Sequence, residues 1–478
     1  MLFSNVFFIF YLLPVIFILY YLCFFSRNLQ NYILMIFGIF FYAIGQAVFI
    51  FVLLFSILWN WGAAILIDKY KRKEQERKLI FISAVVGNLA VLVFFKQLNP
   101  ILSLNLSHTG MENLFRIGLP LGLSYYTLQS LSYIIDVYRG EIEAEHNLCL
   151  IGLYISFFPR MIVGPLSSYG NMKKQMLSRE FSLDLLSSGF CRFVRGLAKV
   201  ILIGNIMARI SDYVFSWSAM GRDYINVPAS LAWLGLLAFL LRLYHQLSGF
   251  SDMAIGLGMM FQYRLPENFR YPFAASSLME FWQRWNITVL GWFKNYVYLF
   301  LRRFSRKIAN MDTVLMNLFF TWFLYALWHG PSWSIMFWGG LQFFFLLVEH
   351  FLGYFDIKRG TWYMRIFFYN VIIFSFVFFR TEDLFVAATF YKNLFILNRN
   401  GFLSDVALIF LREYWLWLTI GIITCFPIIP KLRRLLIARF DKRIFKAVSF
   451  AYPIMMSGLL ILVIIYALME PQVPFNYF

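Results

Sequence analysis

Two short sequences, FWQRWNIT at residues 281–288 and ALWHGPSW at residues 326–333, decide what kind of protein this chain forms. Both place polar side chains inside segments that are otherwise apolar enough to lie in a lipid bilayer. A polar or ionisable side chain at membrane depth is expensive unless it is paired or lines a wet cavity, so it marks a functional site by default. His329 and Asn286 are therefore the first candidate site residues.

The composition extends this interpretation to the whole chain. Of the 478 residues, 61% are hydrophobic and 14% are charged, whereas about 25% of the residues of a soluble domain are charged. A soluble core of this length could not hide so much apolar surface. We predict an all-α polytopic membrane protein that forms one continuous domain over residues 1–478.

The charge pattern gives the predicted orientation. The formal net charge is +18, from 42 basic and 24 acidic residues. The basic residues gather in short loops between apolar runs, which is the positive-inside pattern of cytoplasmic loops. The predicted cytoplasmic segments are 68–78, 171–180, 302–307 and 431–446, of which the last is a loop or an interfacial helix. No basic stretch is long or interleaved with exposed aromatic residues, so nucleic acid is not an expected partner.

Apolar runs predict the membrane spans. Single spans are expected at 5–25, 79–96, 191–214, 229–250, 314–328, 333–350, 365–380, 414–430 and 447–468, and two at 32–67. Residues 97–117 are expected to form an external loop, 279–301 an amphipathic stretch and 381–413 a connection. No basic residue precedes Arg27, so we expect the first span to be retained and not cleaved as a signal peptide.

Glycine and proline interrupt two further apolar runs, at 118–140 and 148–166. At membrane depth these residues leave backbone groups unpaired, which is tolerated where the backbone is buried in protein or lines a cavity. We expect broken or re-entrant helices around a central chamber at both places.

His329 differs from the other four histidines. His108 and His146 lie among polar residues and His350 is expected at an interface, whereas His245 is a weaker candidate for lining a cavity. His329 has apolar flanks and precedes Gly-Pro, which stops a helix and opens the backbone. A histidine in such a place either forms a helix–helix contact or acts as a base, and the residues alone leave both open.

Acyl transfer from a thioester to a hydroxyl needs a base for the hydroxyl proton and donors for the developing oxyanion. A neutral histidine in a low-dielectric chamber suits the first role, and an asparagine amide suits the second. The chain has no Gly-x-Ser-x-Gly elbow, P-loop, His-Glu-x-x-His or His/Cys spacing. Its four cysteines lie far apart. Neither a covalent serine intermediate nor a metal is expected.

Seven stretches, in order, resemble the membrane-bound O-acyltransferases, and specifically the bacterial branch of alginate and peptidoglycan O-acetyltransferases. They are LPLGLSYYTLQ (119–129) with DVYRG (136–140), FFP (157–159) with GP (164–165), SGFSDMAIGLG (248–258), PENF (266–269), EFWQRW (280–285), LWHG (327–330) and PFNYF (474–478). The resemblance covers nearly the whole chain.

This resemblance implies about eleven transmembrane or re-entrant helices in a ring around a thin central chamber with a cytosolic funnel. It implies N-terminal helices at 1–116, a catalytic core at 117–350 and C-terminal helices at 351–478. The invariant histidine of the family falls on His329, with Asn286 as its catalytic partner. The expected substrate-binding residues are Trp282, Trp285, Trp328, Ser248, Asp252 and Arg284.

The implied reaction moves an acetyl group from cytosolic acetyl-CoA, a co-substrate and not a bound cofactor, to hydroxyls of a cell-surface polysaccharide. The bacterial members pass the group outward directly or through an exported acetyltransferase partner, so the bacterial cytoplasmic membrane is the expected location. Lys294, Arg302 and Arg303 either hold the phosphates of the coenzyme or anchor the protein to the membrane.

The chain departs from the family pattern at two positions. Asn286 stands where the bacterial branch usually carries a second histidine, and it resembles the Asn–His pair of lipid- and sterol-acylating members. Gln246 stands where a carboxylate is common. The alternatives are therefore a D-alanyl transferase that uses a carrier protein, a lipid acyltransferase or, from another class, a transporter of lipid-linked sugar.

Overall fold

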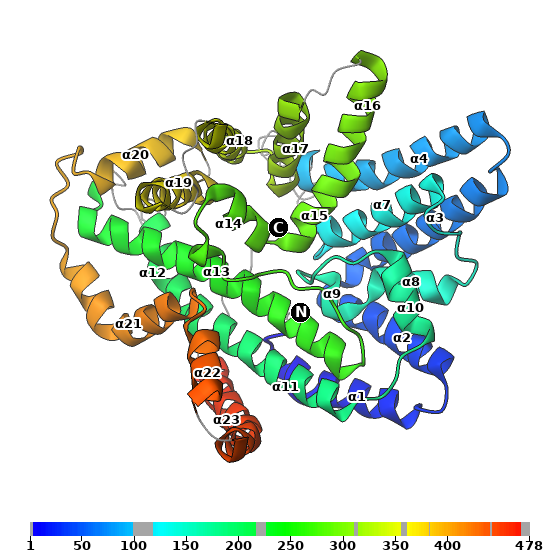
Figure 1. Cartoon of the computed structure of the whole chain (residues 1–478), viewed down its shortest axis with the longest axis horizontal. Helices are drawn as coiled ribbons and strands as arrows, with labels where there is room; N and C mark the ends of the chain where they lie inside the picture. The colour runs from blue at the N-terminus through cyan, green and yellow to red at the C-terminus, as the bar shows by residue number, and fades with distance from the viewer. Residues whose placement is uncertain are drawn as a thin grey trace, which may run out of the picture. The chain divides into compact units, whose positions relative to one another are not determined.

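The structure is a computed structural model that describes residues 3–98, 118–216, 226–309, 314–354, 361–381, 383–439 and 442–469. Within those ranges all regular elements are helices (Figure 1). Eight of the described helical stretches are long and apolar enough to cross a membrane, and Phe8–Leu22 and Val314–His329 are shorter apolar helices. The predicted all-α polytopic membrane fold is confirmed.

The chain divides into two compact units, one of residues 1–190, 253–266 and 478, the other of residues 191–252 and 267–477. Helices α11 (Leu183–Ala198) and α13 (Ala229–Met260) contribute residues to both units. The single domain and the ring of helices stay predictions. The external loop at 97–117, His108 and the PFNYF motif lie outside the described residues, apart from the first two residues of that loop.

The first unit contains eight further helices. They are α1 (Leu13–Leu22), α2 (Arg27–Gly45), α3 (Ile50–Lys69), α4 (Glu74–Val93), α7 (Leu123–Arg139), α8 (Leu148–Ser156), α9 (Phe158–Met161) and α10 (Tyr169–Leu177). Helices α3, α4 and α7 pack against one another, and α2 packs against α8. A Cβ atom at Gly38 would lie 2.0 Å from the Ser156 carbonyl oxygen, so the close approach of α2 and α8 requires glycine there.

Of the two apolar runs in this unit that were predicted to form broken helices, only one is divided into two helices. The 148–166 run is broken at Phe157, between α8 and α9, as expected. The 118–140 run is different, because its glycines and proline lie before or after α7, and α7 itself is continuous. Gly122, at φ 76°, makes the turn into α7.

Two predicted cytoplasmic loops of the first unit are partly helical. Helix α4 begins at Glu74, inside the 68–78 segment, because Glu74 and Glu76 favour the positive end of a helix. Helix α10 occupies most of the 171–180 segment, where Lys, Gln and Met are good helix formers. The charge pattern located these segments, but it does not exclude a helix within them.

The second unit holds the rest of the chain. Its helices are α12 (Asn205–Phe215), α14 (Leu278–Arg284), α15 (Ile287–Trp292), α16 (Leu299–Ala309), α17 (Val314–His329), α18 (Trp333–Tyr354), α19 (Trp362–Arg380), α20 (Leu384–Leu394), α21 (Asp405–Thr424), α22 (Ile428–Arg439) and α23 (Lys442–Met469). The π-helical segments η4 (Lys199–Gly204) and η8 (Phe293–Tyr298) join α11 to α12 and α15 to α16. Helix α18 packs against α14, α17 and α19.

Four predictions for the second unit need correction. The 191–214 span is not one helix, because the π-helical segment η4 interrupts it. Helix α13 is longer than the 229–250 span and includes the SGFSDMAIGLG motif. The 279–301 stretch is broken at residues 285–286, and α16 continues through the basic residues after 301. The 381–413 connection contains α20 and the start of α21.

Candidate active site

The short helix α14 is held at its start by three side chains. Ser277 accepts a hydrogen bond from the Glu280 N–H (3.2 Å), and the Glu349 carboxylate on α18 accepts one from the Leu278 N–H (2.6 Å). Partial burial acts to raise the pKa of Glu280, but hydrogen bonds from Ser276 and the charge of Arg284 hold that pKa below its usual range. These contacts fix where α14 begins.

Asn286 lies in the gap between α14 and α15, in the left-handed region at φ 45° and ψ 48°. Asparagine is one of the few residues with a side chain that adopts this conformation readily. The residue is buried, and its Oδ1 accepts a hydrogen bond from Asn268 Nδ2 at 3.1 Å. The gap between α14 and α15 therefore places an uncharged amide in the interior of the unit.

Asn268, in the PENF segment that precedes α14, holds this arrangement in place. Its Oδ1 accepts hydrogen bonds from the backbone N–H (3.0 Å) and the hydroxyl (2.9 Å) of Thr288. Its own carbonyl accepts a hydrogen bond from the Ile287 N–H at 3.0 Å. The PENF turn thus fastens the start of α15, and the Asn286 side chain is oriented before any substrate arrives.

Tyr325 connects Asn286 to His329. The two residues of α17 are four positions apart, so they lie on one face of the helix. The Tyr325 hydroxyl lies close enough to the Asn286 side chain to interact with it, and the Tyr325 ring lies 4.8 Å from the His329 ring, edge to face. We call Asn268, Asn286, Tyr325 and His329 the histidine centre.

His329 is the last residue of α17, and both of its ring nitrogens are shielded from solvent. Its ring is surrounded by Trp328 at 4.8 Å, Trp338 at 5.7 Å and Phe379 at 5.2 Å between centroids. This aromatic surrounding is a low-dielectric environment that shields the imidazole from bulk water.

Trp282 and Trp285 extend the aromatic surface along α14. Trp282 Nε1 donates a hydrogen bond to Gln342 at 3.2 Å, and its ring lies 6.4 Å from that of Tyr325. Trp285 stacks on Phe281 at 5.4 Å. The structure thus brings five of the eight residues predicted from the sequence into one cluster, namely His329, Asn286, Trp282, Trp285 and Trp328.

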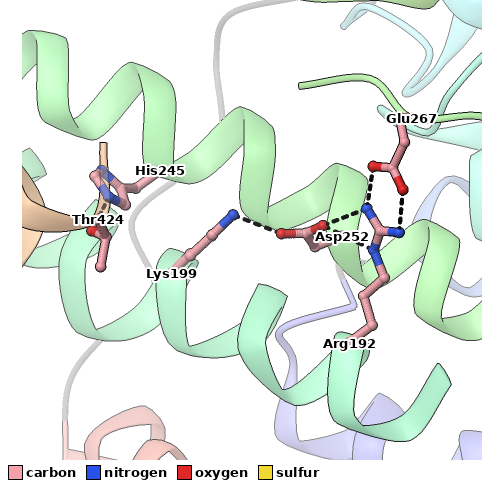
Figure 2. Close-up of polar contacts among 6 residues, drawn as sticks. All are labelled: Arg192, Lys199, His245, Asp252, Glu267 and Thr424. Carbon is pink, nitrogen blue, oxygen red and sulfur yellow. Dashed lines mark hydrogen bonds and ion pairs between the residues drawn. The ribbon is translucent and has the colours of Figure 1, made fainter. Parts of the chain in front are cut away.

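Asp252 belongs to a different group of residues, shown in Figure 2. Its carboxylate accepts a hydrogen bond from Lys199 at 2.6 Å and from Arg192 Nη2 at 2.9 Å. Arg192 also pairs with Glu267, at 2.5 Å. We call these four residues the ion-pair network; it contains two positive and two negative side chains. Its charges balance within the network.

Ser248 and Arg284 also have surroundings of their own. Ser248 is buried on α13, one turn before Asp252. Arg284 pairs with Glu280 on its own helix. None of the contacts described for Asp252, Ser248 or Arg284 reaches His329 or Asn286, so their roles in binding substrate stay predictions.

His245 forms a helix–helix contact. Its Nδ1 lies 2.8 Å from the Leu241 carbonyl oxygen and its Nε2 lies 2.8 Å from the Thr424 hydroxyl (Figure 2). Since a carbonyl only accepts, Nδ1 donates its hydrogen bond to Leu241. This buried histidine joins α13 to α21.

Sequence analysis missed Tyr325 and the role of Asn268. A signal for Tyr325 was present, because helical spacing places it on the face of His329. Asn268 lies in a quoted motif, but only the folded chain shows which atoms it holds.

Comparison with known proteins gives consistent matches. The sequence model of the membrane-bound O-acyltransferase family matches residues 141–381. The chain is 34% identical over 401 residues to the probable alginate O-acetylase AlgI of Pseudomonas putida, covering 83% of this chain and 80% of that protein. It is 28% identical over 433 residues to the peptidoglycan O-acetyltransferase of Helicobacter pylori, covering 83% and 80%. It is 26% identical over 266 residues to the teichoic acid D-alanyltransferase of Bacillus subtilis, covering 54% and 65%.

Proposed function

Because the chain belongs to the membrane-bound O-acyltransferase family, we propose that it moves an acetyl group from cytosolic acetyl-CoA to hydroxyls of a cell-surface polysaccharide. The chain is a multi-pass membrane protein and an O-acyltransferase. The donor, the acceptor, the bacterial cytoplasmic membrane and an exported acetyltransferase partner are the proposed parts. The similarity to alginate and peptidoglycan O-acetyltransferases supports the transfer of acetyl to a polysaccharide, and the other parts are proposed with it.

The observation that carries the proposed mechanism is the connection of His329 to Asn286 through Tyr325. His329 takes the proton of the acceptor hydroxyl as its oxygen forms the new ester bond to the acetyl carbon. The carbon–sulfur bond breaks, and coenzyme A leaves with the proton from His329. The Asn286 amide stabilises the oxyanion that forms between these steps.

The surrounding aromatic side chains have a proposed role in the same step. Trp282, Trp285 and Trp328 are all nearly buried, and they exclude water that would otherwise hydrolyse the thioester. Asp252, Ser248 and Arg284 are proposed to contact substrate farther from the reacting carbon.

The proposal is tested in cells that lack the gene. The chain, the His329→Ala variant and the His350→Ala variant are expressed at equal level, and acetate released by mild base from the envelope polysaccharide is measured. We expect wild-type acetylation with His350→Ala, whose side chain is exposed at the end of α18, and none with His329→Ala. Normal acetylation with His329→Ala would overturn the proposal.

D-Alanyl transfer is the second candidate, because the chain also matches teichoic acid D-alanyltransferases. Base-released D-alanine in place of acetate in the same experiment would favour it.

A further inference from the structure

A cavity of about 290 Å³ lies in the second unit, away from the histidine centre. Three segments form it: the turn after Pro272, the first turns of α19, and the junction of α21 with α22. The hydroxyl of Tyr369 on α19 donates a hydrogen bond to the Phe273 carbonyl at 2.7 Å, which joins two of these segments. The walls of the cavity include Arg365, Tyr369, Phe426, Pro427, Ile428 and Lys431.

Two exposed cations face this cavity, Arg365 from α19 and Lys431 from α22. No carboxylate is among its described lining residues. Within the described part of the chain neither cation takes part in an ion pair. Two like charges that share a cavity raise its local potential and attract an anion.

The surroundings of both cations resemble a membrane interface. Trp362 is 74% exposed and Ile366 is 54% exposed, and both flank Arg365 in the first turns of a helix long enough to span a membrane. Ile429 and Leu432 are exposed on either side of Lys431. Tryptophan beside apolar and basic residues is typical of the level of the lipid headgroups, and α22 has the composition of a helix that lies in this interface.

We propose that the cavity binds the headgroup of an anionic phospholipid. The phosphate lies between the Arg365 guanidinium and the Lys431 ammonium, and the acyl chains extend along the exposed apolar residues of α22. Basic pockets beside membrane helices bind anionic headgroups on the cytoplasmic side, the side that the positive-inside pattern assigns to residues 431–446. The proposal does not depend on the acyl donor or acceptor.

The size of the cavity supports this occupant. Pockets for small molecules commonly occupy roughly 300–1,000 Å³. A cavity at the lower end of that range accommodates a headgroup with its phosphate, while the lipid chains remain outside in the bilayer. It is too small to enclose a whole coenzyme A molecule.

The test measures lipid binding to the full-length protein in a neutral detergent by native mass spectrometry. Phosphatidylglycerol is the anionic probe and phosphatidylcholine the zwitterionic control. We expect Arg365→Gln and Lys431→Gln each to weaken phosphatidylglycerol binding about fivefold, since each basic residue near an anionic surface contributes roughly that factor. Phosphatidylcholine binding is expected to be weak and unchanged.

The matched control is Arg434→Gln, which removes an exposed charge from the same helix but does not line the cavity. It is expected to bind phosphatidylglycerol as the wild type does, and circular dichroism verifies that all variants are folded. If Arg434→Gln weakens phosphatidylglycerol binding as much as the cavity variants do, the binding depends on the general surface charge and the proposal is overturned. Loss of coenzyme A binding in the cavity variants, with phosphatidylglycerol binding intact, would also overturn it.

Discussion

The second unit satisfies polar groups in two different ways. The histidine centre uses uncharged amides, a hydroxyl and an imidazole within aromatic walls. The ion-pair network uses full charges, each neutralised by a neighbour on another segment. A charge at membrane depth must be paired to be tolerated, and a paired charge is held in place by its partner.

This difference suggests that the ion-pair network stabilises the fold, whereas the histidine centre serves the reaction. The network joins α11 to α13 and to Glu267 in the PENF motif, the residue directly before Asn268. The centre offers neutral groups that need not release a counter-ion when charge develops during a reaction. We therefore expect changes in the network to alter mainly stability, and changes in the centre to alter mainly rate.

The largest effect is expected from Asn286→Gly. Glycine keeps the left-handed backbone without strain but removes the amide, and loss of one oxyanion donor lowers turnover about 10²–10³-fold. Turnover is measured as coenzyme A release by purified protein. Arg399→Gly is the matched control, because Arg399 also has positive φ (53°) and is exposed elsewhere in the unit. A similar rate for both variants would remove Asn286 from the mechanism.

Asp252→Ala tests the other side of the comparison. It leaves Lys199 and Arg192 without their shared carboxylate, and breaking a largely buried pair costs about 3 kcal/mol of unfolding free energy. Unfolding in detergent is followed by circular dichroism. Glu267→Gln, at a side chain that is 45% exposed, is expected to cost about 1 kcal/mol or less. If both variants lose the same unfolding free energy, the burial of Asp252 does not determine how much its ion pairs contribute to stability.

The smallest effect is expected from Tyr325→Phe. The ring that packs against His329 remains, but the hydroxyl that interacts with Asn286 is lost, which corresponds to about 1–2 kcal/mol, or about tenfold in turnover. Tyr391→Phe is the comparison, because the Tyr391 hydroxyl donates to the Phe374 carbonyl away from the centre (2.5 Å). That variant should keep its turnover. Equal turnover in the two variants would show that Tyr325 does not position Asn286.

Features set by local sequence were predicted well. Apolar runs located α17, α18 and α19, and Gly-Pro after His329 marked the end of α17 within one residue. The break at Phe157 followed from Pro159 in an apolar run. These features depend on hydropathy and on backbone constraints that act within a few residues.

Features that depend on distant partners could not be predicted. The gap at Asn286 lies in a continuous Trp-rich stretch and is held by Asn268, 18 residues away. The cost of a charge at Asp252 was recognised, but its partners Arg192 and Lys199 lie 60 and 53 residues away. Helix α20 was missed because it is short and only partly apolar.

The measurement that tests the central claim most directly is release of coenzyme A from radiolabelled acetyl-CoA by the purified protein. Wild type, His329→Ala and the exposed control His350→Ala are compared in one detergent, with acceptor polysaccharide present. The account predicts release by wild type and His350→Ala, and a loss of at least about 10²-fold in His329→Ala, the contribution of a positioned base. Release by His329→Ala at the wild-type rate would contradict it.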